Sequence, residues 1–333
     1  MGDLLSAAAS LVSWKTLALA FALINIKTLP LGWHFRLLYH FLTNLRLKPT
    51  APFFPKGKAI LDPHGNPTHP VFVPYSITSR TPLLETDYNL HKSNSTYFSD
   101  LDAARTALVT RIYSPGVGLV SKELDQEFLV ASQKEGKKHI PKRLPIIIVL
   151  GSVYCNFKRE IKPFEKYEMH SRVISWDKKW LYILTAFMRP AKQAGGEKTL
   201  LATGVSKYVV KKGRLTVSPE RILRTGGFLP PRSDQSDSPF EFSEVGTPVS
   251  GEGITSSAVD GSLVREVLKM NEDQIPNGED LEEEKKANSD LWNSEEWSWE
   301  RIEQERLRGL AVVQPFIDVD ENLAKETEAK WNS

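Results

Sequence analysis

Residues 86–105 read TDYNLHKSNSTYFSDLDAAR, and the fold of the whole chain can be argued outward from them. Asp87, Asn89 and His91 alternate through the first part of this stretch. A helical pattern begins directly afterwards, because apolar residues recur at three- and four-residue steps. These residues are Tyr97, Leu101, Ala104, Leu108 and Ile112. The stretch therefore predicts a long helix that starts next to a polar motif.

The start of this helix is a candidate for chemistry. Asn94 or Ser95 suits the N-cap, since a short polar side chain can accept a hydrogen bond from the first backbone amides. The positive end of a helix can hold an anion or polarise a carbonyl. Asp87, Asn89 and His91 would bring a carboxylate, an amide and an imidazole to that end. On the residues alone, they could equally be turn formers and a hydrogen-bonded core histidine.

The composition is that of an ordinary globular protein. The chain has 333 residues, of which 41% are hydrophobic and 25% charged, and a formal net charge of +2. This balance gives no reason to expect nucleic acid as a partner. The single cysteine, Cys155, excludes an intrachain disulfide and suits a reducing compartment. Because it lies in an apolar run, we expect a buried small side chain rather than a reactive thiol.

The N-terminal residues 1–48 are expected to form apolar or amphipathic helices. Residues 7–26 are strongly apolar and about the length needed to cross a bilayer, although Lys15 near their middle would cost roughly 2.5–3.5 kcal/mol. Residues 31–47 mix apolar and basic side chains, which is typical of a helix at a membrane surface. These features favour membrane association over packing on the domain. The basic C-terminal flank predicts a location on the cytoplasmic face of a membrane, or in the cytoplasm.

Residues 49–70 are rich in proline and are predicted to be a linker, and residues 71–225 to be a single α+β domain. Strand patterns are expected at 71–77, 144–157, 164–176, 180–188 and 199–210. Residues 114–143 are interpreted as a polar connection with a short helix near 123–132 and a basic cluster. The last four strands are expected to form a meander, and Ser218-Pro219-Glu220 to open a short helix. Helices do not alternate with the strands, which excludes a βαβ repeat.

The C-terminal third has a different character. Residues 226–280 are predicted to be a disordered linker, because their first part is rich in Ser, Pro, Gly and Asp with few apolar residues. Residues 281–333 are predicted to be an acidic helical tail that either docks on the domain or floats.

A strand, then a long helix next to an Asp/His motif, then antiparallel strands resembles the hotdog fold. The residues Asp87, His91, Asn94, Tyr97, Ala104 and Arg105 are similar to the motif of thioesterases of the 4-hydroxybenzoyl-CoA type. The chain also resembles thioesterase-superfamily member six and thioesterase-like proteins of fungal biosynthetic clusters, in residues 157–165, 175–179 and 217–221. Lys92 stands where that motif has Val or Met, and Ser93 where it has its first Asn.

The resemblance implies a hotdog domain with an antiparallel sheet wrapped around one long helix. It also implies hydrolysis of an acyl thioester, of CoA or an acyl-carrier protein, in lipid or secondary-metabolite biosynthesis. Asp87 would be the general base or nucleophile, with His91 and Asn89 orienting the reacting groups. Backbone amides at Asn94, Ser95 and Thr96 would polarise the thioester carbonyl.

A homodimer is expected by the same resemblance, and neither a cofactor nor a metal is expected. No Gly-x-Ser-x-Gly motif, zinc-ligand spacing or phosphate-binding glycine loop occurs in the sequence. The alternative is a non-catalytic, membrane-tethered hotdog protein that binds acyl chains or scaffolds other enzymes, which Lys92 and Ser93 favour.

Overall fold

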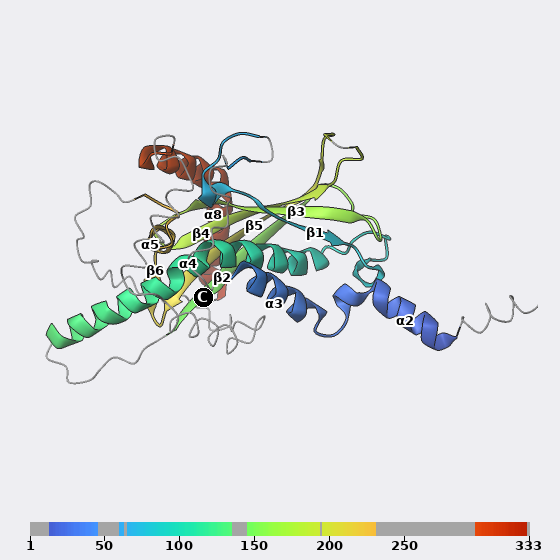
Figure 1. Cartoon of the computed structure of the whole chain (residues 1–333), viewed down its shortest axis with the longest axis horizontal. Coiled ribbons are helices and arrows are strands. Elements are labelled where there is room, and N and C mark those ends of the chain that lie inside the picture. Colours follow the sequence, from blue (N-terminus) through green and yellow to red (C-terminus); the bar gives the residue numbers. More distant parts are fainter. Residues whose placement is uncertain are drawn as a thin grey trace, which may run out of the picture.

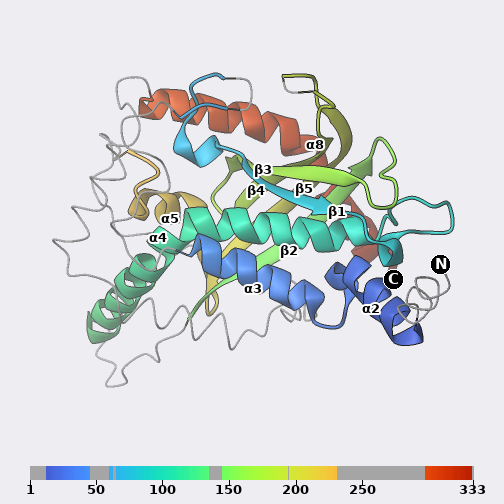
Figure 2. The same ribbon diagram turned by 45° about the vertical axis from the view of Figure 1, so that its right-hand side comes forward.

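The computed structural model describes residues 13–45, 60–62, 65–134, 145–193, 195–230 and 297–331. Most of the proline-rich segment, the basic cluster after residue 134 and most of the expected linker therefore lie outside the described residues. The described part is built around helix α4 (Thr96–Lys134), which runs along one face of an antiparallel sheet (Figures 1 and 2). This is the hotdog arrangement. The predicted stripe is confirmed, since Tyr97, Leu101, Ala104, Leu108 and Ile112 are each at most 3% exposed.

The sheet has six strands, and every pairing is antiparallel. The strands are β1 (Tyr75–Arg80), β2 (Ile146–Phe157), β3 (Lys166–Trp176), β4 (Trp180–Arg189), β5 (Thr199–Lys212) and β6 (Leu215–Val217). The order is β1-β3-β4-β5-β2, with β6 on β5, so the predicted four-strand meander is wrong. Of the four predicted strands, β3, β4 and β5 are consecutive neighbours, whereas β2 pairs with β5 rather than with β3. Helix α4 connects β1 at one edge to β2 at the other edge, and the three later strands fill the space between them.

The first strand lies later in the chain than predicted. Residues Pro70–Phe72 form the 3-10 turn η2, and β1 begins at Tyr75. Pro70 and Pro74 have no amide to donate to a strand. The His69 imidazole also accepts a hydrogen bond from the Val71 amide, at 3.3 Å, which stabilises the turn. Proline geometry and this side-chain acceptor thus outweigh the strand pattern of 71–77.

The polar connection predicted for residues 114–143 is wrong up to Lys134, because α4 continues through Pro115 to that residue and includes the short helix expected near 123–132. The remaining residues 135–143 lie outside the described ranges. The direction of α4 changes along its length (Figure 2), as expected where a proline interrupts the helical hydrogen bonds. Val117 and Leu124 are buried beyond this point, so the second half of the helix still contributes to the core. Helix α5 (Pro219–Thr225), correctly predicted at its Ser218 cap, supports this half through Arg221, which pairs with Glu127 at 2.7 Å.

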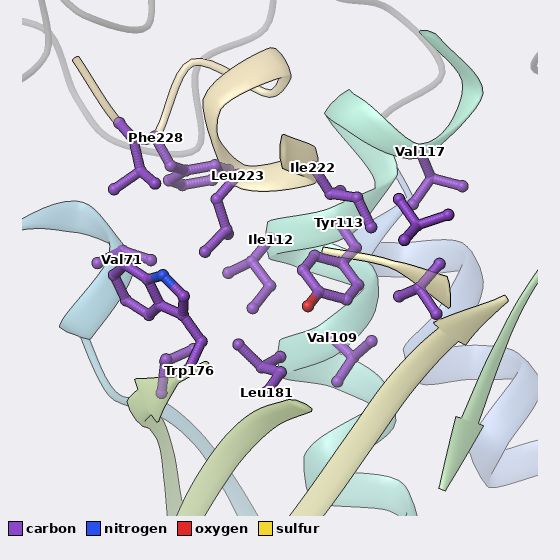
Figure 3. Packing of buried hydrophobic residues seen from close by; sticks show 14 of the residues in the cluster. Val71, Val109, Ile112, Tyr113, Val117, Trp176, Leu181, Ile222, Leu223 and Phe228 are labelled. Atoms are coloured by element: carbon purple, nitrogen blue, oxygen red, sulfur yellow. The ribbon is translucent and has the colours of Figure 1, made fainter. Parts of the chain in front are cut away.

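The largest core cluster lies between α4, the sheet and α5 (Figure 3). Ile112 of α4 lies in it with Trp176 of β3 and Leu181 of β4. Phe228 and Leu229, just after α5, are 7% and 4% exposed and belong to the same cluster. The first residues of the segment predicted to be a linker therefore pack in the core.

Helix α8 (Trp299–Trp331) lies on the opposite face of the sheet from α4. Successive strand residues point to opposite faces, so Ile183 packs in the α4 cluster while Tyr182 packs against Val313 of α8. An irregularity between Val173 and Ser175 of β3 brings the Ser175 hydroxyl to the Arg306 carbonyl, to which it donates at 2.7 Å. The C-terminal helix is therefore docked on the domain.

The N-terminal segment consists of α2 (Trp14–Ile24), the 3-10 turn η1 (Ile26–Thr28) and α3 (Gly32–Asn44). Helix α3 packs along α4 (Figure 2), with Leu37 only 3% exposed. Helix α2 buries none of its residues. Within the described ranges, no helix combines the length and the apolar content needed to cross a membrane.

Candidate active site

The candidate catalytic residues lie in one tight turn, between the 3-10 turn η3 (Leu83–Glu85) and the start of α4. The Asp87 carboxylate accepts hydrogen bonds from the backbone amides of Asn89 at 2.9 Å and His91 at 3.3 Å. The Asp87 amide in turn donates to the His91 carbonyl at 2.9 Å. The structure therefore brings Asp87, Asn89 and His91 together and fixes the carboxylate by two amides.

The tip of this turn is exposed and strained. Tyr88 is 93% exposed and Leu90 is 69% exposed. Leu90 has a φ of 60°, in the left-handed region that a branched side chain rarely adopts. Such strain, of order 1–3 kcal/mol, persists where the surrounding structure enforces it and is common at functional sites. The turn is thus a held conformation rather than a relaxed loop.

The His91 imidazole points to a partner that sequence reasoning missed. Its Nε2 lies 2.9 Å from Oε2 of Glu160, in the connection between β2 and β3. Glu160 lies in the segment 157–165 that carries the family resemblance, but nothing in the spacing pairs it with His91. The described contacts of His91 thus join its side chain to Glu160 and its backbone to Asp87.

Helix α4 begins at Thr96, so Ser95 occupies the N-cap position. The amides of Thr96 and Tyr97 donate to the carbonyls of Ser93 and Asn94, at 3.0 and 3.4 Å. Among the described contacts, the amides of Asn94 and Ser95 have no acceptor within the chain. Two of the three predicted amide positions therefore remain available to a ligand, and the Thr96 amide is already used.

Lys92, which departs from the family motif, points into the protein and is 3% exposed. Its Nζ lies 2.6 Å from Oε2 of Glu85 and 2.9 Å from Oδ2 of Asp100. The ammonium also lies 5.3 Å from the Tyr97 ring centre and 5.5 Å from that of Tyr167. A Lys in place of Val or Met is thus accommodated by two carboxylates and two aromatic rings.

Lys27 of the N-terminal segment joins the same cluster, which was not predicted. Its Nζ lies 2.8 Å from Glu85 and 2.8 Å from Asp100. Burial acts to raise the pKa of Asp100, but Lys27, Lys92 and Arg36 together hold that pKa well below its usual range. Burial lowers the pKa of Lys27, against the opposing effect of Asp100. Burial and then the Asp100 charge raise the pKa of Tyr167 well above its ordinary value.

Two further predictions concern reactive groups. Cys155 lies on β2, is half-buried, and its pKa is raised by burial to about 11. This agrees with the expectation of an unreactive side chain. In the part of the chain that the structure describes, no three His, Cys, Asp or Glu side chains are grouped so that they could hold a metal ion.

The described structure is thus a hotdog domain with a polar turn at the start of its central helix. Comparison with known proteins gives the family. Residues 81–223 match the family model described as the thioesterase-like superfamily. The thioesterase lcsJ of Purpureocillium lilacinum is 33% identical over 323 residues, which cover 92% of this chain and 91% of that protein. The probable thioesterase atnL of Emericella nidulans is 35% identical over 225 residues, covering 63% of this chain and 70% of that protein.

Among solved structures, the YbaW probable thioesterase from Escherichia coli aligns with a TM-score of 0.31 and 14% identity. The alignment covers 45% of this chain and 94% of that one. The chain belongs to the thioesterase-like superfamily. By class it is a thioester hydrolase.

Proposed function

We propose that the chain hydrolyses an acyl thioester of coenzyme A or of an acyl-carrier protein, and that the turn at residues 87–91 supplies the reactive groups. The reaction would belong to the biosynthesis of a lipid or secondary metabolite. The observation that carries this proposal is the position of Asp87. Its carboxylate is fixed by two amides within a strained turn, directly before the start of the central helix. Family membership independently supports thioester hydrolysis by this chain.

In the proposed reaction, Asp87 takes a proton from a water molecule as the water oxygen attacks the thioester carbonyl carbon. The carbonyl oxygen becomes negative, and the amides of Asn94 and Ser95 at the positive end of α4 stabilise it. The carbon–sulfur bond then breaks, and the leaving sulfur takes the proton from Asp87, which gives the carboxylic acid and the thiol and restores the Asp87 carboxylate. His91, held by Glu160, and Asn89 orient the water or the carbonyl.

The test is release of free thiol from a panel of acyl-CoA thioesters of increasing chain length. Asp87→Asn keeps an acceptor for both amides but removes the base, so we expect turnover to fall by about 10²–10⁴-fold. Lys158→Gln, in the exposed connection after β2, is the control and should leave turnover unchanged. Full activity of Asp87→Asn would refute the mechanism. Inactivity of the wild type on CoA and carrier-protein thioesters alike would favour a non-catalytic acyl-binding role.

We further propose that the protein is a homodimer joined through β2. Among the described residues this strand pairs with β5 alone, so its other edge has no described strand partner along 12 residues. Long exposed edges readily pair with another chain, and a charged side chain on the edge opposes such pairing. Light scattering should give a dimer for the wild type and a higher dissociation constant for Ile147→Lys, at an edge residue that is 38% exposed. A monomeric wild type at high concentration would refute this proposal.

We also propose that residues 1–48 associate with a membrane by binding at its lipid surface. Exposed apolar side chains cover the N-terminal segment, including Trp14, Leu17, Phe21, Ile26, Phe35 and Tyr39. Residues 13–45 contain no acidic residue, which suits anionic lipid. We expect co-sedimentation with anionic vesicles that Phe21→Glu weakens. Leu323→Glu, at an apolar position on α8 that is 62% exposed against 48% for Phe21, is the control, and equal loss in both variants would contradict the assignment.

A further inference from the structure

The candidate catalytic turn is the tip of a loop whose base is closed by backbone contacts. The Ser93 amide donates to the Glu85 carbonyl at 2.7 Å, and Thr86 and Lys92 form an antiparallel bridge. The Lys92 amide also donates to the Ile161 carbonyl at 2.8 Å. Glu85 and Lys92 therefore lie across from each other, where the two arms of the loop enter the protein.

Below this base, four charged side chains form a closed quartet. Glu85 and Asp100 each contact both Lys27 and Lys92, with nitrogen–oxygen distances from 2.6 to 2.9 Å. The side chains of Lys92 and Asp100 are 0% exposed, that of Glu85 4% and that of Lys27 12%. Arg36 reaches Asp100 from the rim at 3.0 Å, and its side chain is 21% exposed.

The N-terminal segment supplies Lys27 of the quartet and also Arg36, the cation at its rim. Two carboxylates and two ammonium groups sum to zero, whereas Glu85, Asp100 and Lys92 alone would leave one buried negative charge. A buried charge without its partner is strongly destabilising. A second contact joins the same two segments, since the Asn25 side chain accepts a hydrogen bond from the Leu84 amide at 2.8 Å.

We propose that Lys27 is a positioning residue for the catalytic turn, and that it acts through Glu85 and Lys92 at the base of the loop. The N-terminal segment is then part of the active-site support as well as a candidate lipid-binding surface. This inference rests on the proposed function, because it presupposes that the turn at residues 87–91 carries the reaction.

The first test uses Lys27→Met, which keeps the aliphatic stem and removes the charge. A small displacement of catalytic groups can cost about 10²-fold in rate, so we expect kcat to fall by about 10- to 100-fold with a smaller change in KM. Lys27→Met/Glu85→Gln removes one charge of each sign and should recover most of the lost activity, as should Lys27→Arg. Lys15→Met is the matched control, because Lys15 is an exposed lysine of the same segment.

The second readout does not depend on activity. Hydrogen exchange of the amides of Asn89 and His91, which donate to Asp87, should be faster in Lys27→Met and return toward wild type in the double variant. Thermal unfolding establishes that each variant is folded at the assay temperature. A folded Lys27→Met with wild-type kcat and wild-type exchange would overturn the inference, even if its melting temperature were lower.

The Asp87→Asn variant in the same panel separates this inference from the proposed function. If Asp87→Asn is inactive while Lys27→Met behaves as wild type, the proposed function stands and the positioning role of Lys27 is refuted. If Asp87→Asn is fully active, the proposed function fails, and with it the role of Lys27 in catalysis. Loss of exchange protection in Lys27→Met would then show only that the quartet holds the loop.

Discussion

His69 should make the protein less stable as the pH falls below about 6.5, the ordinary pKa of an imidazole. The residue is 0% exposed, and burial lowers the pKa of its imidazole from 6.5 to about 3. Its ring packs near those of Phe72 and Trp297, with centroids 6.2 and 5.6 Å away. Protonation would therefore place a charge where α8 meets the domain core.

The sign and size of this change in the free energy of unfolding follow from the difference in proton binding between the folded and unfolded chains. Between pH 6.5 and about 3 the unfolded chain binds a proton at His69 that the folded chain does not, so folding loses stability as the pH falls. Each pKa unit corresponds to about 1.36 kcal/mol, which gives an upper limit of about 5 kcal/mol over the full window. Between pH 7 and pH 4 the expected loss from this residue is about 3 kcal/mol.

The measurement is urea unfolding of the wild type and of His69→Asn at pH 7, 6, 5 and 4. The Asn side chain can accept the hydrogen bond of the Val71 amide but does not titrate, so its free energy of unfolding should fall less steeply. Carboxylates and other histidines contribute equally to both proteins and cancel in the difference. Parallel curves for the two proteins would refute the reasoning, and His69→Gln repeats the comparison if the Asn variant folds poorly.

Two further predictions concern α8 and the cysteine. Gly309→Ala would place its Cβ 1.8 Å from the Ile174 carbonyl oxygen, so α8 must move away from the sheet. We expect this movement to lower the free energy of unfolding by about 1–3 kcal/mol, although Ala is intrinsically better than Gly in a helix by about 1 kcal/mol. Urea unfolding should show this loss, whereas Val312→Ala, at a position 59% exposed on the same helix, should change stability by less than about 0.5 kcal/mol. Burial raises the pKa of Cys155 to about 11, so alkylation of the native protein at pH 8 should be about 10²-fold slower than alkylation of an unfolded control. Mass spectrometry measures both rates, and equal rates would contradict this prediction.

The sequence predicted what depends on local pattern. The buried stripe of α4 from Tyr97 to Ile112 follows from helical spacing. The start of α5 at Pro219 follows from the local Ser-Pro-Glu pattern, although the Ser218 side chain makes no capping hydrogen bond. The predicted length of α4 was wrong because tertiary packing, rather than the local pattern, determines where this helix ends. Val117 and Leu124 find core contacts beyond Pro115, so α4 continues through a residue that normally ends a helix.

Only part of the candidate site could be predicted from the sequence, for a related reason. Asp87, Asn89 and His91 stand close together in the sequence, so their grouping could be predicted. Lys27 and Glu85 are 58 residues apart, and no periodic pattern connects them. Lys92 was recognised as a departure from the family motif, but the carboxylates that compensate it become apparent only once the chain is folded.

The folded unit is larger than the part that matches the family. The match covers residues 81–223, whereas β1 ends at Arg80 and Lys27 lies far before it. Phe228, Trp297 and Ile302 contribute to the largest core cluster from the C-terminal side. A fragment of residues 71–225, the domain predicted from sequence, would lack all of these except β1.

This gives a prediction for truncation. Loss of a buried large apolar side chain costs about 2–5 kcal/mol, and the 71–225 fragment loses several, together with one cation of the quartet. Since a typical domain has only about 5–15 kcal/mol of stability, we expect the fragment to show no cooperative unfolding transition by circular dichroism. The chain of residues 13–331 should unfold cooperatively. A cooperative, fully active fragment would mean that both outer segments are dispensable, and the role inferred for Lys27 would fall with it.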